Sequence, residues 1–429
     1  MLVEFKFSNF RSFKEEVIFS MEPLTQNGTN PNTINTGLKK IPQLYRTAGI
    51  FGANASGKTN IFKALGFLRY MLKKSSKMNV EDIWPDETYA LSGDNSVNPM
   101  SFGIQIIIKD ILYDYKVELH NNIIQKESLY YTPISQEGSA MPNRIFNRIM
   151  KDNKAEFEKS KGILQRWCDD TLNNKLFLSA LVNNYNCNIK EIIDVYNELV
   201  NSIKETDASS ISRSFSINRI AEGNGKDIVN LLKKADLGIE DISVREVPVD
   251  ELLKGPDVKK EKISANLMQA LINKSAKVFD VKSYHNTENG KTKEFDLENV
   301  ESNGTKAFLA LSGPILQTIE EGNVIFVDEL DSALHPFLVR YLVSLFNDPE
   351  INKNGAQLIF TSHAHYLMDG ENLSRDQIWF TSKELNNGFY SDLYSLSDFK
   401  KITRRNSSFY EAYMNGIYGA VPFVEKING

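Results

Sequence analysis

The sequence of 429 residues predicts an α/β fold in which a glycine-rich turn and an acidic strand end belong to one sheet. The first observation is an apolar run at residues 47–51, followed by the turn at 52–59 and a helix-like segment at 60–72. The second is an apolar run at residues 324–327 that ends in two carboxylates. Buried parallel strands read as short apolar runs, and α/β sheets bind ligands at the carboxyl ends of their strands. An antiparallel β-layer and an inserted, mainly helical domain are predicted around this core.

Residues 52–59 read Gly-Ala-Asn-Ala-Ser-Gly-Lys-Thr and fit the P-loop pattern G-x-x-x-x-G-K-[ST]. Glycines let consecutive backbone N–H groups surround phosphate oxygens, Lys58 reaches the β- and γ-phosphates, and the Thr59 hydroxyl is placed to bind Mg²⁺. The following helix directs its positive end at the same anion. A glycine-rich turn without a ligand fits the same letters. We predict that the nucleotide is contacted by Gly52, Asn54, Ser56, Gly57, Lys58, Thr59 and Asn60.

Residues 324–329, Val-Ile-Phe-Val-Asp-Glu, predict a buried strand with a Walker B ending. Asp328 is expected to hold Mg²⁺ through its water shell, and Glu329 is expected to polarise the attacking water. Taken alone, the Asp-Glu pair also fits a solvated strand end. Its occurrence in one chain with the P-loop favours the nucleotide interpretation.

The composition is that of a folded chain with 41% hydrophobic and 24% charged residues. No run approaches 18 apolar residues and the start lacks a signal-peptide pattern, so we expect a cytoplasmic protein without a membrane partner. The two cysteines, Cys168 and Cys187, predict neither a disulfide framework nor thiol chemistry. A net charge of -5 gives no general attraction to nucleic acid, which would need a local basic patch or a partner. Three basic runs are candidates, although such runs are usually solvated faces: residues 73–77, 259–262 and 404–405.

The chain divides into three expected domains: an N-terminal lobe at 1–150, a helical insertion at 151–277 and a C-terminal lobe at 278–429. Alternation of apolar and polar residues predicts a β-hairpin at the start and three antiparallel strands at 101–108, 112–120 and 123–131. Spaced apolar positions in the middle of the chain predict helices at 154–172, 189–203, 227–234 and 258–277. Strands return at 277–297.

Residues 301–305, Glu-Ser-Asn-Gly-Thr, open a helix-like stretch about twenty residues before the Asp-Glu pair. A turn of this kind can bind an anion through backbone N–H groups, and by itself it equally fits an ordinary N-cap. Placed upstream of the Walker B strand, it resembles the signature motif of ABC-type ATPases, which typically contacts the γ-phosphate held by the opposite subunit.

Two more segments agree with this resemblance. Leu-Asp-Ser-Ala-Leu-His-Pro at 330–336 resembles the D-loop, and the strand at 357–360 leads to His363 at the position of the switch histidine. An imidazole there can donate a hydrogen bond to the γ-phosphate and hold the attacking water. The alternative of a metal pair formed by His363 and His365 lacks a nearby cysteine or third histidine in the sequence.

With Asn-Phe-Arg-Ser-Phe at 9–13, this motif order resembles the SMC/RecF/OLD-like branch of ABC ATPases. It resembles more closely the stand-alone AAA-family ATP-binding proteins of bacterial abortive-infection and anti-phage systems. The core resemblance covers residues 1–147 and 300–396, residues 404–422 also resemble the ending of this family, and residues 176–180 match less specifically. It implies a P-loop NTPase fold of ABC-ATPase type, with ATP and Mg²⁺ as ligands.

Three departures limit the resemblance. The turn at 301–305 is not the Leu-Ser-Gly-Gly-Gln of transporters, so Ser302 and Gly304 carry over better than its other positions. The Q-loop glutamine cannot be placed, and Gln105 and Gln125 are only candidates. About 65 residues follow His363, fewer than the roughly 100–150 of a typical domain, so we expect no TOPRIM nuclease of the OLD kind.

The resemblance therefore implies an ATPase that holds Mg-ATP between two copies of the chain, in a homodimer or a higher homo-oligomer. Ser302 and Gly304 would complete the site of the other copy, and turnover would be slow and regulated by a partner. The expected role is a sensor or scaffold in anti-phage defence that controls a separate effector, such as a nuclease, a TOPRIM-like protein or a toxin. Alternatives are an SMC/RecF-like DNA-repair or DNA-maintenance ATPase, a transporter's ATPase subunit, which the departure at 301–305 disfavours, and a nucleotide-gated binding module with negligible turnover.

Overall fold

The computed structural model describes residues 1–24, 31–91, 98–133, 142–151, 154–157, 162–235, 237–248, 277–383, 389–399 and 409–421. The chain forms two compact units. The first contains Met1–Asp207, Thr318–Leu330 and Leu342–Gly429, and the second contains Ala208–Gln317 and Asp331–Tyr341. Each unit is described by itself below. The three expected domains stay a prediction, and the two units group the residues of the middle segment differently.

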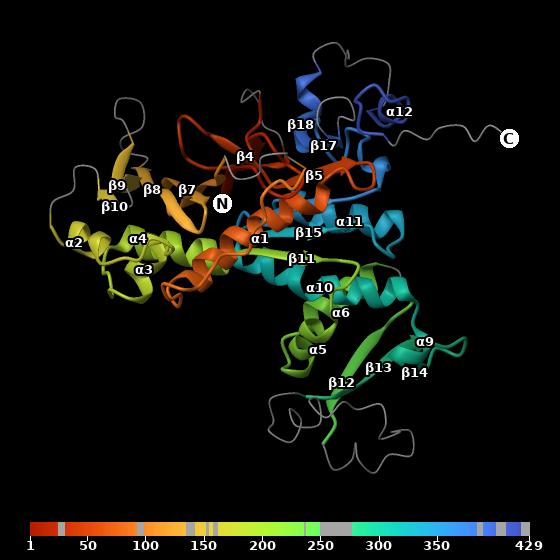
Figure 1. Ribbon diagram of the computed structural model, residues 1–429. Helices are drawn as coiled ribbons and strands as arrows, with labels where there is room; N and C mark the ends of the chain where they lie inside the picture. Colours follow the sequence, from red (N-terminus) through yellow and green to blue (C-terminus); the bar gives the residue numbers. More distant parts are fainter. Residues whose placement is uncertain are drawn as a thin grey trace. The chain divides into compact units, whose positions relative to one another are not determined.

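A six-stranded sheet forms the centre of the first unit (Figure 1). Its strands in spatial order are β11 (Ile203–Asp207), β15 (Val324–Asp328), β16 (Gln357–Thr361), β5 (Thr47–Gly52), β17 (Ile378–Lys383) and β18 (Ser391–Ser395). Neighbouring strands are parallel from β11 to β17, and β18 is antiparallel to β17. Every residue of β5, β15 and β16 is buried, which explains the unbroken apolar runs in their sequences.

The predicted antiparallel β-layer is a seven-stranded sheet of the same unit. Its spatial order is β10 (Lys154–Phe157), β9 (Asn143–Lys151), β8 (Ile123–Pro133), β7 (Ile111–His120), β6 (Met100–Ile108), β1 (Leu2–Ser8) and β2 (Val17–Ser20). The β1–β2 hairpin and the three strands expected at 101–131 are confirmed. A small ribbon of β3 (Thr33–Asn35) and β4 (Gln43–Tyr45) precedes the core strand β5.

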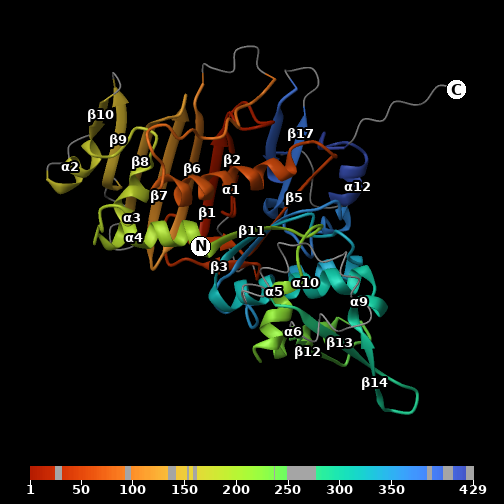
Figure 2. The same cartoon turned by 60° about the horizontal axis from the view of Figure 1, so that its bottom comes forward.

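Helix α1 (Lys58–Ser75) packs against both large sheets and crosses the β-layer in Figure 2. Its Phe62 ring meets Phe326 of β15 edge-on, with ring centroids 5.2 Å apart. Nearer its C-terminal end, Phe67 contacts Phe102 of β6 at 5.8 Å. Apolar side chains at helical spacing produce the buried stripe between these contacts: Ile61, Leu65, Leu68 and Leu72. The two sheets therefore fix the helix that begins at the P-loop.

The middle of the chain differs from the expected row of helices. The helix expected at 154–172 is wrong at its start, where residues 154–157 form β10 and pair with β9. Period-two alternation over four residues is too short a signal to separate from helical spacing, so strand pairing decides the outcome. The helical elements that follow in the first unit are α2 (Ile163–Asp169), α3 (Phe177–Asn183), α4 (Lys190–Asn197) and the π-helical turn η2 (Glu198–Ser202). This turn leads directly into β11 of the core sheet.

The second unit contains a three-stranded antiparallel sheet of β12 (Asp241–Glu246), β13 (Phe279–Asn286) and β14 (Thr292–Asp296). The strands expected at 277–297 are confirmed. Helices α5 (Ser214–Ala221), α6 (Lys226–Lys234) and α9 (Leu297–Val300) belong to this unit, together with the first parts of α10 (Asn303–Glu321) and α11 (Pro336–Asn347). Residues 258–276 of the expected last helix, and the basic runs at 259–262 and 404–405, lie outside the described residues.

Short elements close the first unit: 3-10 turns η4 (His365–Leu367), η5 (Arg375–Gln377) and η6 (Leu396–Asp398), and helix α12 (Phe409–Met414). Both cysteines are buried and unbonded to each other. In the described part of the chain, no helix combines the length and the apolar character that a membrane crossing requires.

Candidate functional site

The candidate site lies at the carboxyl edge of four neighbouring strands of the core sheet. In the order β11, β15, β16 and β5, these strands are parallel, so their carboxyl ends share one edge. Asp207 ends β11, Asp328 ends β15, His363 follows β16 by two residues, and the P-loop follows β5. An α/β sheet binds its ligands at this edge. The fold thus brings together segments that are up to about 300 residues apart in the sequence.

The backbone of the P-loop has the shape of a phosphate cradle. Gly52 has φ 152° and Gly57 has φ 117°, values that side-chain-bearing residues rarely adopt. A Cβ atom on Gly52 would lie 2.4 Å from the carbonyl oxygen of Thr381, and one on Gly57 would lie 2.6 Å from Ser391 Oγ. Both positions therefore require glycine.

Lys58 lies buried across this cradle. Its Nζ donates hydrogen bonds to the carbonyl oxygens of Gly52 at 2.8 Å and of Ala53 at 3.1 Å. No side chain caps the N-terminus of α1, and no acidic residue lies in its first turn. An uncapped helix start next to a buried ammonium group suits an anion. The fit of the P-loop to a phosphate group thus rests on its own geometry.

Two other predicted contact residues have protein partners. Ser56 Oγ lies 2.5 Å from Thr381 Oγ1, which ties the loop to β17. Asn60 Nδ2 donates to Ser12 Oγ at 2.8 Å, which ties the first turn of α1 to the segment after β1. Asn54 is exposed at the tip of the loop, and Thr59 is half-buried. The P-loop is therefore anchored to the chain on two sides while its tip stays accessible.

The two carboxylates after β15 have different surroundings. Asp328 is buried, and its Oδ1 accepts a hydrogen bond from the Thr361 hydroxyl. The same hydroxyl oxygen accepts the backbone N–H of Glu329 at 2.8 Å. Glu329 is exposed and has φ 52°, a strained left-handed value for a residue other than glycine. Thr361 therefore hydrogen-bonds to both residues of a sharp turn at the end of β15. Asp328 stays buried at the strand end, and Glu329 is exposed beyond it.

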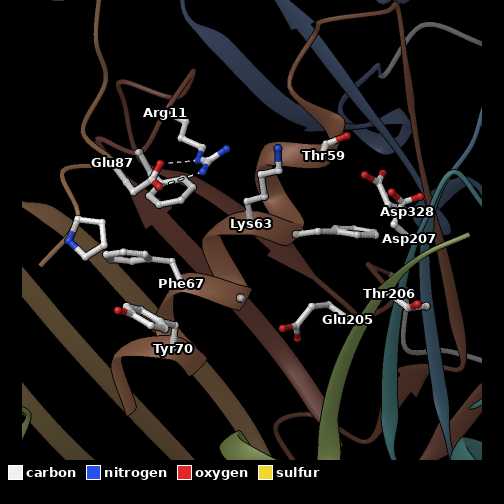
Figure 3. Close-up of a pocket in the computed structure, with 14 residues that line it drawn as sticks. Arg11, Thr59, Lys63, Phe67, Tyr70, Glu87, Glu205, Thr206, Asp207 and Asp328 are labelled. Carbon is white, nitrogen blue, oxygen red and sulfur yellow. Dashed lines mark hydrogen bonds and ion pairs between the residues drawn. The ribbon is translucent and has the colours of Figure 1, made fainter. Parts of the chain in front are cut away.

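A cavity of about 580 Å³ opens next to these residues within the first unit. Thr59, Asp207 and Asp328 line one end of it, and Phe67 and Tyr70 line the other (Figure 3). Lys63 projects from α1 between the two ends. The cavity therefore contains the hydroxyl and the carboxylate that the sequence predicts for Mg²⁺. A hydroxyl and carboxylates are oxygen ligands of the type that Mg²⁺ prefers, so the residues present fit this ion.

Asp207 is a candidate functional residue that the sequence did not reveal. It is the register partner of Asp328 across the β11–β15 pair, and Figure 3 shows both carboxylates at the same end of the cavity. In the sequence, β11 reads Ile-Lys-Glu-Thr-Asp, with a single apolar residue. A short edge strand of this composition gives almost no periodic signal. The Q-loop candidates Gln105 and Gln125 lie instead on β6 and β8 of the β-layer.

Thr361 is the second candidate residue that the sequence analysis missed, and its position at a strand end could have revealed it. It is the last residue of the strand before His363, and strand ends at this edge of the sheet carry the polar contacts. His363 itself is exposed. The nearby His365 stacks on Tyr413 of α12 with ring centroids 4.5 Å apart. The two histidines therefore have different surroundings.

The expected signature turn, residues 301–305, belongs to the second unit. Ser302 caps the start of α10, because its Oγ accepts the backbone N–H of Thr305 at 3.1 Å. A Cβ atom on Gly304 would lie 3.0 Å from the carbonyl oxygen of Ala333, so the turn packs against the segment expected to be the D-loop. Lys58, Asp328 and His363 therefore belong to the first unit, whereas Ser302 and Gly304 belong to the second.

The match of the chain to a family of AAA domains agrees with this fold class. No curated protein matches the chain. A similar solved structure is the SMC head domain from Thermotoga maritima, with 13% identity, a TM-score of 0.42, and coverage of 92% of this chain and 98% of that one. Residues 48–369 match the family described as "AAA domain, putative AbiEii toxin, Type IV TA system". This match covers well over half of the 429 residues, so the chain belongs to this family of AAA-domain proteins.

Proposed function

We propose that this protein binds Mg-ATP between two copies of itself and hydrolyses it slowly. The observation that carries the proposal is the shared edge of β11, β15, β16 and β5, where the P-loop, two aspartates and a histidine follow neighbouring parallel strands. Membership of an AAA-domain family supports ATP as the nucleotide. The cavity at this edge supports a site large enough for more than a phosphate group.

In this proposal each residue has a role that its position supports. Lys58 leaves the carbonyl oxygens of the loop to bind the β- and γ-phosphates, and the backbone N–H groups of the cradle bind the remaining oxygens. Thr59 and Asp328 hold Mg²⁺. When bound, this ion neutralises charge that develops on the phosphoryl oxygens. Asp207 provides a second carboxylate beside Asp328 and orients water at the metal end of the cavity.

Glu329 acts on the attacking water, and His363 acts on the γ-phosphate. Glu329 accepts a hydrogen bond from the water and orients it toward the γ-phosphate. His363 donates a hydrogen bond to the γ-phosphate as charge develops there. The exposure of both side chains supports closure of the site by a second copy of the chain, which would contribute Ser302 and Gly304. Turnover is then slow in the isolated subunit, because half of the site is missing.

The direct test is Glu329→Gln, which keeps the shape of the side chain and removes its charge. We expect this variant to bind ATP, to form a stable dimer, and to lose at least about 100-fold in turnover. Sedimentation velocity with and without Mg-ATP measures the dimer, and phosphate release measures turnover. Glu350→Gln, at an exposed position just after α11, is the matched control and should behave as the wild type. A fully active Glu329→Gln protein contradicts the proposal.

We also propose a cellular role for this ATPase. The family description names a putative toxin and a type IV toxin–antitoxin system. Together with the resemblance of the sequence motifs to ATP-binding proteins of anti-phage systems, it is the basis for proposing that the chain controls a separately encoded effector during phage infection. An SMC/RecF-like DNA-maintenance ATPase is the alternative, and the net charge of -5 counts against it. Phage plating on cells with wild-type or Lys58→Ala protein tests the first role. ATP-dependent binding to DNA ends, absent in the Lys58→Ala protein, would favour the second.

A further inference from the structure

A buried carboxylate lies directly before the signature turn in the second unit. The side chain of Glu301 is only 6% exposed. Its Oε1 accepts hydrogen bonds from Ser283 Oγ at 2.6 Å and from His285 Nε2 at 2.7 Å. A carboxylate removed from water needs such partners, because burial without them is costly. Two donors of one strand therefore hold this acidic group in place.

Both donors come from the same face of β13. Residues 283 and 285 are two apart, and side chains in a strand alternate between faces with a period of two. The strand is itself fixed between β12 and β14. The His285 ring also meets Phe295 of β14 edge-on, with centroids 5.5 Å apart. The pair of donors is thus mounted on the centre of a three-stranded sheet.

Glu301 connects this sheet to the turn. Its backbone N–H donates to the carbonyl oxygen of Leu297 at 3.2 Å, so it follows α9 without a gap. The next residue, Ser302, caps α10 through its hydroxyl and accepts the N–H of Lys306 at 3.0 Å through its carbonyl oxygen. Fixing the Glu301 side chain therefore fixes the point at which α10 begins. Ser302 directly precedes α10, and Gly304 lies in its first turn.

We propose that His285 and Ser283 are positioning residues for the signature turn. Through Glu301 they hold Ser302 and Gly304 in the geometry that completes the nucleotide site of a second copy of the chain. This inference rests on the proposed function, since only a shared site gives the turn a task outside its own subunit. It makes the β12–β13–β14 sheet part of the ATPase mechanism, although none of its residues touches the nucleotide.

The inference predicts that loss of His285 weakens dimerisation of the chain but not the binding of ATP to the monomer. His285→Ala removes one of two hydrogen bonds to a buried carboxylate, so the turn loses its fixed position. The P-loop of the same subunit belongs to the other unit and keeps its structure. We expect unchanged ATP affinity of the monomer, about 10- to 100-fold weaker ATP-dependent dimerisation in the Glu329→Gln background, and a similar loss of turnover in the protein that retains Glu329.

Two further variants separate positioning from folding. His285→Gln keeps an N–H donor near the Nε2 position and should recover most of the dimerisation. Tyr284 lies on the opposite face of β13, and Tyr284→Phe removes its hydroxyl contacts with Glu294 of β14 at 2.9 Å and with Ser243 of β12 at 3.2 Å. This variant should behave as the wild type. If the His285→Ala protein fails to fold, Ser283→Ala carries the same test, because it removes the other donor and leaves the imidazole in place.

The closing experiment mixes two inactive proteins. His285→Ala has an intact P-loop and a displaced signature turn, whereas Lys58→Ala has the opposite defect. In a mixed dimer, one site combines the intact P-loop with the intact turn, so turnover and ATP-dependent dimerisation should rise well above the sum of the two variants. Sedimentation velocity of the mixture gives a readout that does not depend on turnover.

The possible failures are distinguishable. If the wild-type chain does not dimerise with Mg-ATP, the proposed function fails and this inference fails with it. If the wild type dimerises and His285→Ala dimerises equally well, the inference alone is overturned. The same holds if the mixture shows no recovery, or if His285→Ala lowers the ATP affinity of the monomer.

Discussion

Glu127 and Asp328 are both buried carboxylates of the first unit, and their surroundings differ in a way that separates structure from function. Glu127 is 0% exposed and accepts hydrogen bonds from the Tyr115 hydroxyl at 2.9 Å and from the N–H groups of Phe177 and Leu178 at 2.5 and 2.9 Å. Asp328 accepts a hydrogen bond from Thr361 and lines a cavity. The first is enclosed by donors, whereas the second faces open space.

The electrostatics of Glu127 follow from its enclosure. Burial raises the pKa of Glu127, while the N–H groups of α3, the charge of Arg148 and the Tyr115 hydroxyl lower it in part. Arg148 is also 0% exposed, and its guanidinium donates to the carbonyl oxygens of Thr171, Leu172 and Lys175. Glu127 and Arg148 thus join the β-layer to the start of α3 and to the segment before it. This arrangement stabilises the packing of α3 against the β-layer, and neither charged side chain is accessible to a ligand from solvent.

The largest effect on stability is expected from Glu127→Gln. The change leaves the Arg148 charge buried without its counter-charge and turns amide hydrogens toward backbone donors, which costs about 3–5 kcal/mol of unfolding free energy. Urea denaturation followed by tryptophan fluorescence measures this loss, and the ATP affinity of the folded fraction should not change. Glu118→Gln, at a half-exposed position that pairs with Lys126, should stay within about 0.5 kcal/mol of the wild type. If Glu127→Gln lowered the unfolding free energy by less than about 1 kcal/mol, Glu127 would not be the structural counterpart of Asp328 that we describe.

Asp328→Asn should show the opposite pattern. We expect about 100- to 1000-fold lower turnover, because the proposed Mg²⁺ site loses a charged group that holds the ion, and a melting temperature without nucleotide close to that of the wild type. Phosphate release and differential scanning fluorimetry measure the two quantities. Asp392→Asn, at an exposed position on β18 of the same sheet, is the matched control. Strong destabilisation by Asp328→Asn would show that this carboxylate is structural as well.

The smallest effect is expected from Asp207→Asn, which tests whether the neighbouring strand end shares the role of Asp328. We expect about tenfold lower turnover and a higher Mg²⁺ concentration at half-maximal activity, with unchanged nucleotide binding in the absence of the metal. Titration of activity with Mg²⁺ measures the shift. Asp110→Asn, in an exposed turn of the β-layer, should leave the titration unchanged. An unshifted Asp207→Asn curve would assign the metal end of the cavity to Asp328 alone.

The predictability of these residues from the sequence follows the strength of their local signals. Asp328 follows four apolar residues of a strand buried on both faces, and Lys58 lies in a motif with fixed spacing, so both were predictable. Asp207 was not, because β11 is an edge strand with a single apolar residue whose pairing with β15 joins segments about 120 residues apart. The hydrogen bonds to Glu301 were not predictable either, because they depend on how the end of α9 packs against β13 and not on the spacing of residues within the strand.

Two boundaries between the units lie next to the candidate site in the chain. The chain leaves the first unit immediately after Asp207, and again at Leu330, one residue beyond Glu329. Two of the covalent links between the units therefore start from acidic strand ends of the nucleotide edge. The other two links lie inside the helices α10 and α11. The candidate site and the second unit are therefore direct neighbours along the chain at two strand ends.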